Sequence, residues 1–183
     1  MQLRRAAIAV CALALGASVS LAACGNADEK QGVDSPAREG LALELDGVKY
    51  DVFLTRELNP RIQEDTAYVT RDAPPGQALY GVFIQACNHT HDSQSATDSF
   101  TLRDNQNDTF QPKPLPSSNP FAYHPRKLGP KECIPAAGSV AQLGPTAGSL
   151  LLFQLPLSVT ENRPLELEIH GPSGGKLTYD LDI

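Results

Sequence analysis

The residues best suited to bind a metal or carry out chemistry form one short run, Cys87-Asn88-His89-Thr90-His91-Asp92. At the end of a strand alternate side chains share a face, so Cys87, His89 and His91 would point the same way. A thiolate beside two imidazoles is a ligand set for transition metals. The run therefore predicts one of two things: solvent-facing histidines at the start of a loop, or a weak zinc or copper site formed by His89, His91 and His124.

Other arrangements with possible chemistry are weaker. The run 104–108 holds carboxylates and amides, but it lacks the ligand spacing, central Gly and terminal Glu of a calcium loop, and indicates a polar hairpin turn. No serine lies in a Gly-x-Ser-x-Gly elbow. Glu166 and Glu168 fall on one face of an alternating strand, where we expect an exposed, solvated surface. We predict no catalytic residue, no cofactor and no enzymatic activity.

The first 23 residues have the layout of an export signal. Arg4 and Arg5 precede an uncharged stretch that ends in Leu21-Ala22-Ala23-Cys24. The alternative is a single transmembrane anchor, because an uncharged stretch of this length is at the lower limit of a membrane span. Its ending, however, resembles the lipobox of bacterial lipoproteins, in which the cysteine receives diacylglycerol and becomes the first mature residue. The resemblance implies a signal peptide over 1–23, lipidation of Cys24, and a cell-membrane lipoprotein that faces the extracytoplasmic side.

Charge narrows the set of partners. Loss of the two arginines Arg4 and Arg5 with the signal would take the net charge from −6 to −8. Such a chain lacks the basic patch that neutralises phosphates, so we expect no nucleic-acid partner. It also gains no attraction to anionic headgroups, so the acyl chains on Cys24 would have to supply the anchor. Residues 24–40 are polar, mix Gly, Pro and charge, and predict a flexible linker.

The remainder of the chain has the patterns of β-strands. Residues 165–170 and 176–183 alternate apolar and polar side chains, which is typical of half-buried strands. Residues 79–87 and 150–155 are apolar on both faces and suit central strands.

Shorter segments complete the expected fold. Residues 100–103 and 108–110 flank the polar turn and predict a hairpin, and further short strands are expected at 41–45 and 138–142. No window of ten residues has helical spacing between capping signals. About eight strands with many turns predict an all-β, immunoglobulin-like antiparallel β-sandwich over residues 41–183.

Three of these segments also resemble a known bacterial pattern: YGVFIQACN at 80–88, FTLRD at 100–104 and LLFQLP at 151–156. They resemble the immunoglobulin-like domain of unknown function common in Gram-positive lipoproteins, akin to the immunoprotective extracellular proteins of mycobacteria. The resemblance covers roughly 41–183. It implies a sandwich at the cell envelope and no catalytic residues. This chain departs from the pattern in a long proline-rich insertion and an added cysteine pair.

That insertion and the cysteine pair belong together. Residues 112–135 hold seven of the fifteen prolines, so they cannot pair in a central strand and must run over the surface. Once Cys24 is lipidated, Cys87 and Cys133 are the two thiols left in the mature chain, and the exported environment favours a bond. We predict a Cys87–Cys133 disulfide that pins the loop 111–138 to the sheet.

Phe121 and Tyr123 place two aromatic rings in this loop. They either form a contact surface for a partner or pack onto the sandwich. Taken together, the patterns predict a non-enzymatic, lipid-anchored envelope lipoprotein that binds an unknown envelope protein or ligand. The alternative is a lipoprotein that binds a metal or small ligand through His89 and His91.

Overall fold

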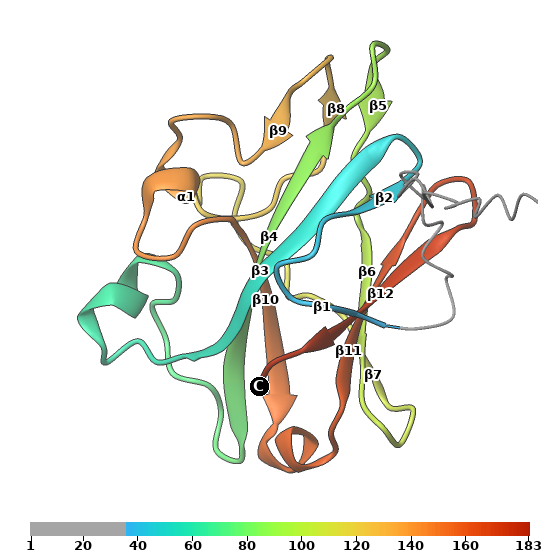
Figure 1. Cartoon of the computed structure of the whole chain (residues 1–183). Coiled ribbons are helices and arrows are strands. Elements are labelled where there is room, and N and C mark those ends of the chain that lie inside the picture. Colours follow the sequence, from blue (N-terminus) through green and yellow to red (C-terminus); the bar gives the residue numbers. More distant parts are fainter. Residues whose placement is uncertain (1–35) are drawn as a thin grey trace, which may run out of the picture. The chain divides into compact units, whose positions relative to one another are not determined.

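The computed structural model describes residues 36–183, which form two packed β-sheets and a third sheet of two strands (Figure 1). The predicted signal peptide, Cys24 and the linker up to residue 35 lie outside the described residues. The strands are β1 (Ala37–Arg38), β2 (Leu43–Leu45), β3 (Val48–Leu58), β4 (Gln77–Asn88), β5 (Gln94–Ser95), β6 (Ser99–Arg103), β7 (Thr109–Phe110), β8 (Lys127–Leu128), β9 (Cys133–Ile134), β10 (Ser149–Pro156), β11 (Leu165–His170) and β12 (Lys176–Leu181). The short helices are η1 (Gln63–Ala67), α1 (Val140–Leu143) and η2 (Leu157–Glu161).

The order of the strands is that of an immunoglobulin-like sandwich. The first sheet runs β1-β12-β11-β6-β7 and the second runs β10-β4-β3-β2, with β9 also paired to β4. Strands β12, β11 and β6 thus take the places of G, F and C, while β3, β4 and β10 take those of A, B and E. Only β1 and β12 pair in parallel among the described strands. The predicted all-β sandwich is confirmed.

The core lies between the two sheets and is built by the alternation seen in the sequence. On β11 and β12, Leu167, Ile169 and Tyr179 point inward and are fully buried. Strand β4 faces two ways: Val82 joins this central core, while Phe83 joins a second cluster on the outer side of the second sheet. This second cluster explains why β4 and β10 are apolar on both faces.

Strand β10 lies at the edge of its sheet rather than at the centre, but its outer edge is covered by the proline-rich loop. The Lys113 amide donates to the Leu152 carbonyl oxygen at 2.6 Å, and the Leu150 amide donates to the Phe121 carbonyl oxygen at 2.7 Å. The loop therefore occupies the place that strand D has in an immunoglobulin domain. Burial on both sides explains a composition that suited a central strand.

Two other expectations are wrong. The predicted strand 138–142 is replaced by α1, because the Ser139 side chain caps its first turn by accepting the Gln142 amide. Residues 37–38, which the sequence placed in the linker 24–40, form β1 against β12.

The folded part therefore begins before residue 41. The carboxylate of Glu39 accepts the amides of Thr55 and Asp182, at 3.2 and 3.3 Å, and fastens the entering chain to both sheets. Among the described residues no helix has the length and apolar character to cross a membrane.

Candidate functional site

The predicted disulfide is present and ties the end of the proline-rich loop to the second sheet. Cys87 of β4 and Cys133 of β9 are bonded, with an S–S distance of 2.06 Å. The neighbouring Asn88 side chain reinforces the junction, since its amide donates to the carbonyl oxygens of Leu128 and Gly129 at 3.1 and 3.0 Å. This end of the sandwich is thereby fixed.

The structure does not bring the candidate metal ligands together. His89 and His91 are exposed in the loop after β4, and His124 is exposed in the proline-rich loop, 3.2 Å from the Asn119 carbonyl oxygen. The disulfide also removes the Cys87 thiolate from any ligand set. Across residues 36–183, no three His, Cys, Asp or Glu side chains lie close enough to hold a metal ion.

The aromatic pair of the loop belongs to the core, which corrects the idea of a contact surface. Phe121 and Tyr123 are each 8% exposed. Phe121 packs edge-on against Tyr68 at 4.8 Å between ring centroids, and Tyr123 packs edge-on against Phe100 at 5.1 Å. The Tyr123 hydroxyl donates to the Thr97 carbonyl oxygen at 3.0 Å. Of the two alternatives, packing onto the sandwich is correct.

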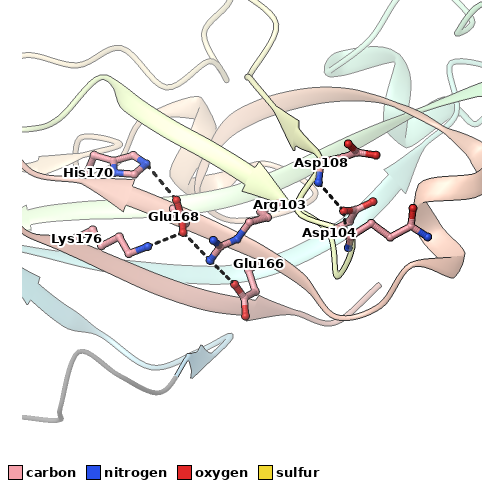
Figure 2. A network of polar contacts seen from close by, with 8 residues as sticks. Arg103, Asp104, Asp108, Glu166, Glu168, His170 and Lys176 are labelled. Carbon is pink, nitrogen blue, oxygen red and sulfur yellow. Dashed lines mark hydrogen bonds and ion pairs between the residues drawn. The ribbon is translucent and has the colours of Figure 1, made fainter.

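A second correction concerns the outer face of the first sheet. Glu168 is only 7% exposed, although the alternation placed it in solvent. Its carboxylate lies 2.7 Å from the Arg103 guanidinium, 2.6 Å from the Lys176 ammonium and 3.5 Å from the His170 ring (Figure 2). Arg103 also binds Glu166 at 2.9 Å.

The register of the strands explains this cluster. Glu168 stands directly opposite Thr101 on β6 and Thr178 on β12, whose short side chains leave room above the sheet. Arg103 and Lys176 stand diagonally to Glu168 and can reach across that room. Long cationic side chains therefore cover a carboxylate that would otherwise face water.

The charge state of Glu168 follows from these contacts. Burial alone opposes ionisation, but the hydrogen bond and charge of Lys176, with the charges of Arg103 and His170, outweigh it and hold the pKa of Glu168 below its usual value. The group is a structural carboxylate held by its neighbours.

At one end of the sandwich a different polar network joins two loops. Asp104, which is 4% exposed, accepts the amides of Gln106 and Asp108 at 2.9 Å each. Its other oxygen accepts the Asn162 side chain at 3.2 Å. Asn162 in turn accepts the Gln106 side chain at 3.1 Å, and its backbone oxygen accepts the Asn105 amide at 3.2 Å. The polar turn predicted at 104–108 is confirmed. Its partner is Asn162, which directly follows η2, a helix that was not predicted.

Between these two loops lies a cavity of about 620 Å³, which we call the loop-end cavity. In Figure 1 the β6–β7 turn and η2 lie together at the bottom of the sandwich, opposite the end that carries β5 and β8. The lining includes two carboxylates and no cationic side chain. Its residues are Gln106, Asn107, Asp108, Thr109, Phe110, Pro156, Ser158, Val159, Glu161 and Asn162.

The signals for these two sites were only partly visible in the sequence. The Asp and Asn residues of 104–108 indicated a turn, but its partner Asn162 is 58 residues away from Asp104. The cluster at Glu168 depends on which residues stand opposite one another, and alternation along one strand does not contain that information.

The fold is similar to solved structures of several bacterial proteins. A candidate lipoprotein from Bacillus subtilis matches with a TM-score of 0.51 and 11% identity, over 81% of this chain and 39% of that one. A functionally unknown protein from Listeria monocytogenes matches with a TM-score of 0.50 and 10% identity, over 81% and 84%. An uncharacterised β-sandwich protein from Clostridium difficile gives a TM-score of 0.49 and 16% identity, over 81% and 95%. This chain thus spans less than half the length of the Bacillus protein.

At these identities the likeness is one of fold alone, and the chain is an all-β sandwich protein. No known protein family and no curated protein matches the sequence. The likeness supports the predicted β-sandwich, whereas the resemblance to lipoproteins and to the mycobacterial proteins stays a prediction.

Proposed function

We propose that this protein is a non-enzymatic lipoprotein of the cell membrane whose sandwich binds a ligand or envelope protein on the extracytoplasmic side. The sequence Leu21-Ala22-Ala23-Cys24 supports a diacylglycerol anchor on Cys24. A similar fold in a candidate lipoprotein from Bacillus subtilis is consistent with that location.

The proposal that the sandwich binds a ligand rests on the loop-end cavity. Loops at the ends of a sandwich are a common place for recognition, because a rigid scaffold positions them. Here the buried carboxylate of Asp104 and the Asn162 side chain join both loops, so the cavity keeps its shape before a ligand arrives. A site that is ordered in advance loses less conformational entropy on binding.

Photo-crosslinking in cells tests this proposal. A photoreactive amino acid replaces Ser158 or Glu161, which are exposed in the cavity, or His91, which is exposed in the loop between β4 and β5. Strand β5 lies at the opposite end of the sandwich (Figure 1). We expect an adduct with an envelope component from the two cavity positions and none from His91. Equal adducts from all three positions, or none from the cavity, would contradict the proposal.

A further inference from the structure

The lining of the loop-end cavity is polar and acidic, which restricts the ligands it can take. Asp108 and Glu161 supply two carboxylates, and the whole chain is acidic. An anionic ligand would meet repulsion from both side chains, with no cation in the lining to offset it. A metal ion is disfavoured as well, because no three His, Cys, Asp or Glu side chains gather anywhere in the described part of the chain.

The remaining groups match the surface of a sugar. Hydroxyl and amide groups of Asn107, Thr109 and Ser158 can both donate and accept hydrogen bonds, as the hydroxyls of a sugar ring do. In the described residues, neither these side chains nor the two carboxylates bond to another side chain. Each carboxylate can accept from two neighbouring hydroxyl groups.

Phe110 adds an apolar platform to this polar lining. Its ring is half-buried, with one part packed against the core and another part lining the cavity. An aromatic face attracts the partly positive C–H groups on one side of a pyranose ring, for the same reason that it attracts the edge of another ring.

We infer that the loop-end cavity binds a neutral oligosaccharide of two or three rings, which stacks on Phe110 and hydrogen-bonds to the loops joined by Asp104 and Asn162. A cavity of about 620 Å³ is within the size range of small-molecule sites. The inference rests on the proposed function, since it names the class of ligand for the same cavity.

Calorimetric titration tests the inference on the mature protein, extracted from membranes in a detergent without a sugar headgroup. The probes are chitotriose, cellotriose and maltotriose as neutral sugars, and trigalacturonate as an anionic sugar. We expect saturable binding of at least one neutral trisaccharide at millimolar concentrations and none of trigalacturonate. Phe110→Ala should weaken that binding about threefold to tenfold, because it removes the stacking ring.

Two variants separate loss of the ring from loss of the fold. Phe110→Tyr keeps the ring and should keep the affinity. Phe53→Ala removes another half-buried phenylalanine, one that lies outside the cavity lining, and should leave binding unchanged. Absence of binding by all three neutral sugars, preference for trigalacturonate, or full affinity in Phe110→Ala would overturn the inference. If crosslinking from the cavity captures a protein instead, the proposed function stands while the sugar assignment fails.

Discussion

The outer-face cluster shows how one carboxylate can depend on its neighbours. Glu168 is held by Arg103 and Lys176 in a position with little exposure to water. Its cost of desolvation is offset by two cations rather than one, which makes the site sensitive to loss of the negative charge. The substitutions that test this are at Glu168 itself and at the more exposed Glu166.

We expect Glu168→Gln to lower the free energy of unfolding by about 2 kcal/mol at pH 7, because it removes the negative charge that Arg103 and Lys176 share and leaves Lys176 without a counter-charge. Glu166→Gln is the matched control and should cost less than half of that, since Glu166 contacts Arg103 alone. Urea unfolding measures both. Equal losses for the two variants would show that Glu168 has no special role.

The same contact predicts a pH dependence. The folded protein lowers the pKa of Glu168, so the stabilisation is complete above the unfolded value of about 4.3 and is lost as pH falls through the folded value. The difference between wild type and Glu168→Gln should therefore be fully present at pH 5 and shrink below about pH 4. A difference that grows as the pH falls below about 4 would contradict the lowered pKa of Glu168.

Asp51 differs from Glu168, because its surroundings raise its pKa instead of lowering it. One of its carboxylate oxygens is buried without a hydrogen-bond partner, and burial raises the pKa of the group. A carboxylate with a raised folded pKa destabilises the folded protein where it is charged, so Asp51→Asn should raise the melting temperature at pH 7. The gain should vanish below the unfolded pKa, near pH 4. Calorimetric melting at the two pH values checks this, and a lower melting temperature at pH 7 would refute it.

At the scale of elements, the proline-rich loop replaces an edge strand. It covers β10 by backbone hydrogen bonds, is pinned by the Cys87–Cys133 bond, and buries Phe121 against the outer side of the second sheet. A segment without regular structure thus completes both the sheet edge and a second hydrophobic cluster. Its aromatic residues should consequently affect stability.

Phe121→Ala should lower the free energy of unfolding by about 3 kcal/mol, because it leaves a cavity beside Tyr68. His124→Ala, an exposed substitution in the same loop, should change it by no more than about 0.5 kcal/mol. Denaturant unfolding of the two variants measures the effect. An unchanged free energy of unfolding in Phe121→Ala would contradict the packing of this ring in the core.

The sequence predicted those elements whose pattern is local. Alternation over 165–170 and 176–183 predicted half-buried strands, and Leu167 and Tyr179 on their apolar faces are fully buried. Strand β1 was missed because two residues form a strand only when β12 is beside them. The helix α1 could have been found from Ser139, which is a good N-cap, but the segment is short and follows a proline-rich stretch.

Of the candidate sites, the sequence predicted the disulfide and the polar turn but neither the Glu168 cluster nor the loop-end cavity. The disulfide followed from a count of thiols, and the turn from Asp and Asn residues in succession. The cluster and the cavity arise from residues that meet only after strands far apart in sequence have paired, such as Arg103 with Glu168 and Asp104 with Asn162.

At the scale of the whole molecule, the proposal joins a lipid anchor to a binding domain. Cys24→Ser removes the sulfur that would receive diacylglycerol. We expect this variant to leave the membrane fraction, or to remain unprocessed at its export signal, while its sandwich stays folded. Cys11→Ser, inside the predicted signal peptide, is the control and should fractionate like the wild type. Cleaved Cys24→Ser protein that remains in the membrane would refute lipid anchoring through this residue.

The most direct test of the proposed anchored protein is the intact mass of the chain extracted from membranes. We predict a polypeptide that begins at Cys24, carries diacylglycerol on that residue, and gains the mass of two hydrogens on reduction of the Cys87–Cys133 bond. A chain that begins elsewhere, or one that begins at Cys24 without lipid, would contradict the account.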